Sequence, residues 1–140
     1  MKIAIIIHNN KGQTKYIADK LSKSYKNSEV EIIELVPIEN DSNQTVELEF
    51  YPNFEDYDKV FIGAPLIKGE LSPVMEEFLL KLPHSENQVV TGFITQFSLS
   101  SSKKGLIARD SMIELCVSKN IKVLEVENIK WLNPFLGADI

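Results

Sequence analysis

The residues with the clearest capacity for chemistry form the segment from Asn9 to Thr14, which reads Asn-Asn-Lys-Gly-Gln-Thr. Its amide, ammonium and hydroxyl groups can all donate hydrogen bonds to an anion. An apolar run precedes this segment and a helical pattern follows it, so the segment joins a strand to a helix N-terminus. Free backbone N–H groups and the positive end of the helix dipole favour a phosphate at such a place. An ordinary strand-to-helix turn is the alternative interpretation, because glycine and asparagine are common in turns.

Other chemistry-bearing residues favour structural roles. The sequence contains neither G-x-G-x-x-G nor G-x-x-x-x-G-K-[ST], which speaks against a dinucleotide-binding fold and a P-loop nucleotidase. His8 ends an apolar run, and we expect it to cap the sheet rather than to act as an acid or base. Cys116 lies on the inward stripe of a helical pattern and has no second thiol, so we expect a core residue. These patterns predict no catalytic side chain and no metal site.

The elements that must position the phosphate segment alternate between strands and helices. Continuous apolar runs predict buried strands at residues 2–8, 59–62 and 88–95, and runs with alternating charge predict edge strands at 30–36 and 121–126. Helical spacing predicts three helices, which start near Thr14, near Ser72 and ahead of Ala108. Three central and two edge strands fit a parallel sheet in the order 2-1-3-4-5, with the ligand at the carboxyl ends of strands one and three.

Two helices of the full alternating pattern have no place in this sequence. The stretch between residues 37 and 59 shows no amphipathic helix, and residues 128–140 are interrupted by Pro134 and Gly137. We therefore expect the second and fifth helices to be reduced or absent, which leaves one face of the sheet thinly covered. The apolar residues of the last segment must then pack on this face or meet another chain, as in a homodimer; they are Trp131, Leu132, Phe135 and Leu136.

In these features the chain resembles the flavodoxin family, in which a Ser/Thr-x-Thr-Gly-x-Thr loop after the first strand wraps the phosphate of FMN. Gly12 and Thr14 match that loop, whereas Asn9 and Lys11 stand where hydroxyl residues are usual. Residues 57–65 read YDKVFIGAP and are similar to the family's third strand, which ends in Gly-x-Pro before a flavin-contacting loop. The resemblance covers residues 2–127. It implies a flavodoxin-like three-layer α/β sandwich, in which residues 1–140 form a single domain.

The resemblance also implies noncovalent FMN binding by three segments of the chain. Family members often stack an aromatic ring on the flavin from the loop that holds Leu66 and Ile67 here, so Phe97 is the available aromatic residue, with a core role as its alternative. Gly69 is expected to present a peptide near the reactive flavin nitrogen. The expected cofactor-binding residues are Asn9, Asn10, Lys11, Gly12, Gln13, Thr14, Ala64, Pro65, Leu66, Ile67, Lys68, Gly69, Gln96, Phe97 and Ser98.

Composition sets bounds on the partners. The 140 residues are 44% hydrophobic and carry a formal net charge of -5, which suits one folded domain and disfavours nucleic acid as a partner. The first apolar run is too short to span a membrane and no cleavage site follows it, so we expect a cytoplasmic location and no membrane partner.

The function that the resemblance implies is electron transfer through FMN. The chain would act either as a carrier between redox partner proteins or as a small reductase whose substrate is a quinone or NAD(P)H. A cofactor-free interaction domain that kept the fold is the alternative, motivated by Asn9, Lys11 and the missing loop aromatic. For the flavin's surroundings, we expect the acidic residues Glu70, Glu76 and Glu77 to lie close to the ring.

Overall fold

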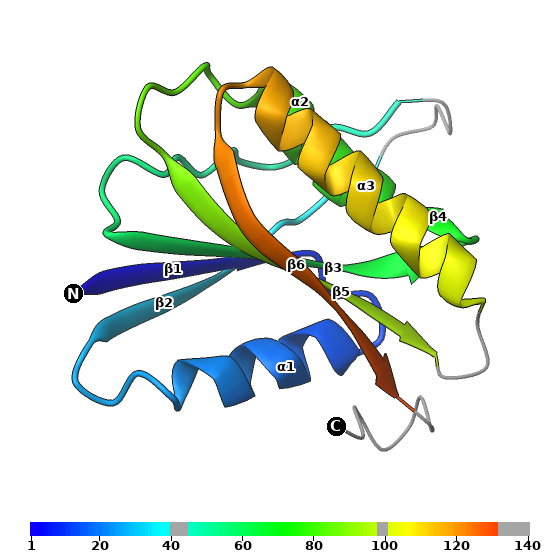
Figure 1. Cartoon of the computed structure of the whole chain (residues 1–140), viewed down its shortest axis with the longest axis horizontal. Helices are drawn as coiled ribbons and strands as arrows, with labels where there is room; N and C mark the ends of the chain where they lie inside the picture. The colour runs from blue at the N-terminus through cyan, green and yellow to red at the C-terminus, as the bar shows by residue number, and fades with distance from the viewer. Residues whose placement is uncertain (40–44, 98–100, 132–140) are drawn as a thin grey trace.

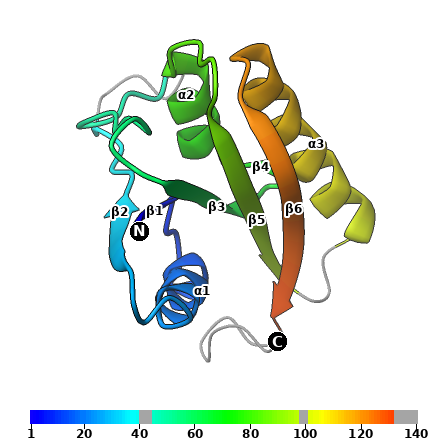
Figure 2. The same cartoon turned by 60° about the vertical axis from the view of Figure 1, so that its left-hand side comes forward.

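A central sheet lies between helices on both of its faces in the computed structural model, which describes residues 1–39, 45–97 and 101–131 (Figure 1). Helix α1 covers one face, and α2 and α3 cover the other (Figure 2). This is the three-layer arrangement that the alternating sequence pattern predicts. The elements are β1 (Lys2–Ile7), α1 (Gln13–Ser22), β2 (Glu29–Glu34), β3 (Lys59–Ile67), β4 (Glu70–Leu71), α2 (Pro73–Lys81), β5 (Val89–Phe97), α3 (Ser102–Ser118) and β6 (Lys122–Trp131).

The order of the parallel strands confirms the predicted sheet. The five long strands run β2-β1-β3-β5-β6, and the short strand β4 pairs antiparallel with β3 outside this path. Without β4, this is the predicted order 2-1-3-4-5. β1 is buried from Ile3 to Ile7, whereas the charge-alternating strands β2 and β6 form the two edges. Apolar runs therefore mark the strands that are covered on both faces.

Three strands are longer than the sequence predicts. β3 continues to Ile67 because Leu66 and Ile67 pair with β4 across a turn at Lys68 and Gly69, whose φ angles are 51° and 79°. β5 and β6 pair as far as Phe97 and Trp131. Residues 64–67 and 96–97 are thus strand rather than loop. Partners distant in sequence extend 64–65 and 96–97, and the local hairpin with β4 extends 66–67.

Helix boundaries follow local signals more closely. Ser72 caps α2 by accepting the Met75 N–H at 3.3 Å, and Pro73 follows at the first helical position, as predicted. α1 ends at Ser22, so Tyr25 lies beyond the helix and packs against Phe61 with ring centroids 5.8 Å apart. Tyr25 continues the helical spacing of Ile17 and Leu21 because all three side chains pack against the same part of the core, although the helix itself ends before Tyr25.

The apolar core has one part on each face of the sheet. The part under α2 and α3 includes the fully buried Phe78, Met112 and Cys116, and the part under α1 includes Ile5 and Ile17. Burial raises the pKa of the Cys116 thiol to about 12, so the thiol stays protonated at neutral pH. The predicted core role of Cys116 is confirmed.

The connection between β2 and β3 contains no helix in its described residues, 35–39 and 45–58. A single antiparallel bridge joins Pro37 to Leu48, and the Tyr51 hydroxyl donates to Glu77 on α2 at 2.6 Å. The predicted loss of the second helix is confirmed for these residues. The predicted loss of the fifth helix and the packing of Leu132, Phe135 and Leu136 concern residues 132–140, which lie outside the described residues.

Candidate functional site

A cavity of about 290 Å³ opens at the carboxyl edge of the sheet. The strand order reverses at β1 and β3, and ligands of doubly wound sheets bind at such a switch point. Residues from the β1–α1 loop, the start of α1, β3, β5 and the end of β6 line the cavity: Asn10, Lys11, Gln13, Pro65, Leu66, Thr95, Gln96, Phe97 and Trp131. The structure therefore brings together members of all three segments that the sequence selects.

The predicted phosphate segment forms the tight entry to α1. Gly12 holds φ at +95°, a left-handed conformation that favours glycine, and a Cβ built there would meet no atom within 4 Å. Asn9 Oδ1 accepts the backbone N–H groups of Gly12 at 3.1 Å and Lys15 at 3.3 Å. The side chain expected to donate to an anion thus also caps the helix with its oxygen, while its Nδ2 group supplies the donors.

Thr14 points into the interior rather than into solvent. Its side chain is 1% exposed, and its Oγ1 lies 2.9 Å from Oγ1 of Thr95, which is equally buried. Either hydroxyl can donate in this pair, so Thr14 keeps a proton for an anion only when Thr95 is the donor. Thr95 is a site residue that sequence reasoning missed; its position next to Gln96 at a strand end was the available signal.

An aromatic pair forms another part of the cavity wall. The rings of Phe97 and Trp131 have centroids 5.1 Å apart and are tilted by 44°. Among the described residues, the buried Nε1 of Trp131 has no hydrogen-bond partner. A buried indole N–H usually has one, so an unpaired donor at a cavity wall is a feature of binding sites. Phe97 was expected at the site, whereas Trp131 was expected to pack on the thin sheet face or to meet another chain, because the predicted last strand ends at residue 126 and β6 continues to Trp131.

The other residues that were predicted to bind the cofactor lie near the cavity or outside the described residues. Ala64 is fully buried within β3, and Ile67, Lys68 and Gly69 form the β3–β4 hairpin beside the cavity rather than its wall. Ser98 lies outside the described residues. Glu77 is held by Tyr51 through a 2.6 Å hydrogen bond.

His8 lies at the same edge but serves the structure. Its Nδ1 is 2.5 Å from Oγ of Ser72, a fully buried residue whose oxygen also caps α2. Burial lowers the pKa of His8, so the imidazole is neutral at pH 7. A serine that is fully buried and engaged on both sides is not an accessible nucleophile. The contact agrees with the prediction that His8 caps the sheet.

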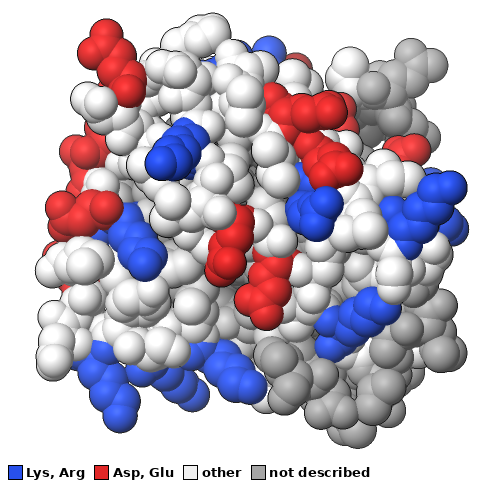
Figure 3. Space-filling model, in the orientation of Figure 1, with Lys and Arg blue, Asp and Glu red and all other residues white. Residues whose placement is uncertain are grey.

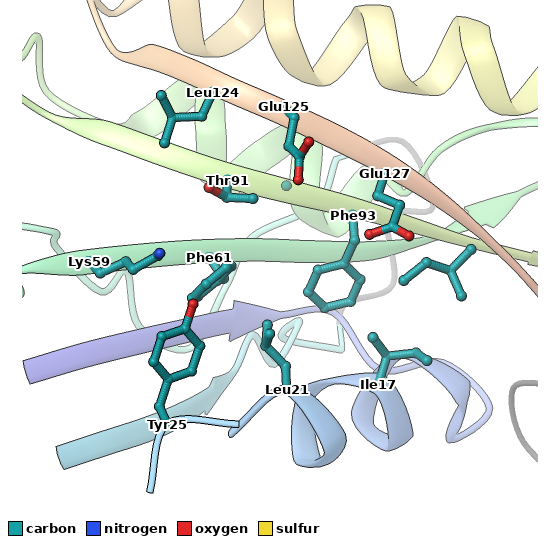
Figure 4. A pocket seen from close by; sticks show the side chains of 12 residues that line it. Ile17, Leu21, Tyr25, Lys59, Phe61, Thr91, Phe93, Leu124, Glu125 and Glu127 are labelled. Atoms are coloured by element: carbon teal, nitrogen blue, oxygen red, sulfur yellow. The ribbon is translucent and has the colours of Figure 1, made fainter. Parts of the chain in front are cut away.

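A second cavity of about 440 Å³ lies on the face covered by α1 (Figure 4). Ile17 and Leu21 of α1 face Phe93 across it, and Glu125 and Glu127 of β6 line the opposite side. Lys59 lies over the rings of Tyr25 and Phe61 at 5.3 and 5.2 Å. In the described part of the chain, α1 is the helix that covers this face of the sheet. The cavity therefore lies in the thinly covered region that the sequence predicts. It is not at the carboxyl ends of the strands, where the first cavity lies.

Metal-ligand clusters and membrane-spanning helices are both lacking in the described residues. Residues 1–39, 45–97 and 101–131 hold no cluster of three or more His, Cys, Asp or Glu side chains suited to a metal ion. Within the same ranges, every helix is too short or too polar to cross a lipid bilayer.

The strand order and the position of the cavity together define a class of protein. A doubly wound three-layer sandwich whose cavity lies at the strand switch point belongs to the ligand-binding α/β proteins. Comparison with protein families makes this specific. The model of the flavodoxin domain family matches residues 4–112, and the chain belongs to the flavodoxin family.

Solved structures show the same fold at low sequence identity. A flavodoxin from Streptococcus pneumoniae superposes with a TM-score of 0.68 at 14% identity, over 95% of this chain and 87% of that one. A flavodoxin, WrbA-like protein from Agrobacterium tumefaciens gives 0.55 at 15% identity, over 86% and 74% of the two chains. A flavone reductase gives 0.62 at 14% identity, over 94% of this chain and 54% of its own. No curated protein sequence matches the chain.

Proposed function

We propose that the chain binds FMN noncovalently at the carboxyl edge of the sheet and uses it for electron transfer. One observation carries the proposal. A single cavity connects the loop at the N-terminus of α1 with the pair formed by Phe97 and Trp131. It offers hydrogen-bond donors for a phosphate at one end and aromatic rings for a flavin at the other.

The two ends of the cavity suit the two ends of FMN. At the loop, the exposed Lys11 and the N-terminus of α1 supply positive charge. At the other end, Pro65 and Leu66 add apolar surface to the aromatic pair. The unpaired Nε1 of Trp131 is a donor that carbonyl oxygens of a flavin can satisfy. The residues present therefore fit the cofactor that the family implies.

The chain's own residues bind and orient, because a bound flavin supplies the redox chemistry itself. Lys11, which lines the cavity, and Asn9, which lies next to the lining residue Asn10, would hold the phosphate end. The Thr14–Thr95 hydrogen bond ties the helix to β5 beneath the cavity. Leu66 and Phe97 would shield a bound flavin ring from water. No side chain is assigned as an acid or a base, since the one perturbed histidine, His8, is engaged with Ser72.

The proposal covers two roles, a carrier between redox proteins and a small reductase of quinones or NAD(P)H. The similarity to flavone reductase is one of fold, so it is compatible with both roles. For either role, we propose that the protein acts in the cytoplasm. A cofactor-free interaction domain is the competing proposal, and it predicts that the cavity takes up no flavin.

Trp131 provides a direct test because it is the only tryptophan in the chain and lines the cavity. Titration with FMN should quench its fluorescence to saturation, and riboflavin, which lacks the phosphate, should bind much more weakly. Free tryptophan amide, titrated with FMN in parallel, is the control for quenching that does not require binding. Absence of saturable quenching would refute FMN binding, and equal affinity for FMN and riboflavin would refute the role of the loop.

A further inference from the structure

Five exposed lysines surround the carboxyl edge of the sheet, although the chain as a whole is acidic. They come from the loop before α1, the β3–β4 turn, the start of α3 and the end of β6, and we call them the lysine rim: Lys11, Lys68, Lys103, Lys104 and Lys130. Figure 3 shows Lys or Arg side chains in blue on its right, the side where β5 and β6 end in Figure 1, as well as along its lower left edge. Glu70 is the acidic residue of the same turn.

Contacts hold two members of the lysine rim in place. The side chain of Lys104 passes over the β3–β4 turn, where a Cβ built on Gly69 would lie 2.8 Å from its Cδ and 3.4 Å from its Nζ. Lys130 Nζ donates to Ser102 Oγ at 2.7 Å and so links β6 to the start of α3. These contacts position charge at the edge of the cavity, a placement that spacing along the sequence does not reveal.

The rim lysines stand outside close ion pairs with the described residues, although the exposed Glu70 follows the Lys68–Gly69 turn. Among the described residues, the ion pair within 4.0 Å is Arg109 with Asp110, so no rim lysine is paired with a described carboxylate. The formal net charge is -5, and removal of five positive charges leaves -10 on the rest of the chain (-5 - 5 = -10). The rim therefore gathers five of the fifteen Lys and Arg residues of the chain at the edge that holds the cavity.

The rim is wider than the anionic group of a small ligand. The strands β1, β3, β5 and β6 are neighbours, and three spacings of about 4.8 Å place the outer two roughly 15 Å apart. A phosphate or carboxylate contacts one or two lysines, whereas charge spread over this width is complementary to a protein surface. We propose that the lysine rim is the docking surface for an acidic redox protein that exchanges electrons with the flavin.

This inference rests on the proposed FMN binding and adds the chemistry of the partner. Two molecules of a one-electron acceptor would remove two electrons from fully reduced, anionic flavin, which also loses one proton. Complementary charge speeds such encounters by about 10- to 1,000-fold at low salt, and salt removes the gain because charges are screened beyond roughly 10 Å. The sign of the salt dependence therefore reports the charge of the surface that meets the partner.

The test uses FMN-loaded, reduced protein mixed in a stopped-flow instrument with cytochrome b5, an acidic acceptor, or with cytochrome c, a basic one. The rate with the acidic cytochrome should fall at least about tenfold between low and high ionic strength, and the rate with the basic cytochrome should not fall. The opposite signs would overturn the proposal. If the protein takes up no FMN, the proposed function itself fails, and this result is seen before any acceptor is added.

Charge reversal locates the surface. A triple variant, Lys103→Glu, Lys104→Glu and Lys130→Glu, avoids the cavity lining and should lose about tenfold of the low-salt rate with the acidic cytochrome. The matched control reverses three exposed lysines near the amino edge and should stay within about twofold of the parent; its changes are Lys26→Glu, Lys81→Glu and Lys122→Glu. Equal effects of the two variants would overturn the proposal. So would a rim effect seen with ferricyanide alone, which would assign the rim to small anions.

Discussion

Substitution of Asn9 by aspartate separates the two roles that the structure gives this side chain. The oxygen accepts the N–H groups of Gly12 and Lys15 at 3.1 and 3.3 Å, and a carboxylate preserves both bonds. A negative charge at a helix N-terminus stabilises by about 0.3–1 kcal/mol. Asn9→Asp should therefore keep or slightly raise the free energy of unfolding in urea.

The same substitution should weaken FMN binding because the Nδ2 donor is replaced by an anionic oxygen. Loss of one hydrogen bond to a charged group costs about 1.5–3 kcal/mol, which corresponds to roughly 10- to 150-fold in affinity. Repulsion between carboxylate and phosphate adds to this loss. Because riboflavin has no phosphate, its affinity should not change.

Titration of the Trp131 fluorescence with both flavins measures the effect in parent and variant. Asn87→Asp, a change of the same charge at an exposed residue near the amino edge, should leave both affinities at the parental value. Unchanged FMN affinity in Asn9→Asp would refute the reasoning that the Asn9 amide meets the phosphate. Parallel losses for FMN and riboflavin would refute it as well, since they indicate a distorted cavity.

Three further predictions concern pH, packing and charge. The lowered pKa of His8 means that the unfolded chain binds the proton more tightly, so the free energy of unfolding should fall as pH drops below about 6.5; His8→Gln should remove this fall, and His84→Gln should keep it. Gly105→Ala should destabilise by about 1–3 kcal/mol in urea, because its Cβ would lie 1.9 Å from Gln96 Oε1; a gain in stability would refute this packing. Lys11→Glu should weaken FMN binding at low salt, and unchanged affinity there would place its ammonium in bulk solvent.

Most of the fold was predictable because the signals are local. The apolar run of β1 and the charge alternation in β2 and β6 identify central and edge strands, and their order follows from this difference. The Ser72–Pro73 start of α2 is equally legible. Strand ends were harder to predict. The last residues of β5 and β6 pair with each other across distant parts of the sequence, and those of β3 pair with the two-residue strand β4, which is too short to leave a periodic pattern.

The same limit applies to the candidate site. The loop from Asn9 to Thr14 and the ring of Phe97 were predictable from residue type, order and family resemblance. Thr95 and Trp131 were missed, since each becomes a site residue through a contact that spans distant parts of the chain: Thr95 with Thr14, and Trp131 with Phe97.

Charge placement around the cavity differs from the sequence expectation. Acidic residues of the third-strand loop and α2 were expected to surround the flavin, but Glu77 is bonded to Tyr51. Lys104, more than thirty positions along the chain, instead lies over Gly69. None of the expected acids, Glu70, Glu76 and Glu77, lines the cavity, and the fold brings a cation from another helix to the turn.

The central claim is that this cavity takes up FMN through its phosphate. The most direct measurement is an absorption spectrum of the purified protein after incubation with FMN and gel filtration. We predict that flavin absorbance co-elutes with the protein in equimolar amount, and that incubation with riboflavin leaves much less. A protein peak without flavin absorbance, from a folded sample at saturating FMN, would contradict the account.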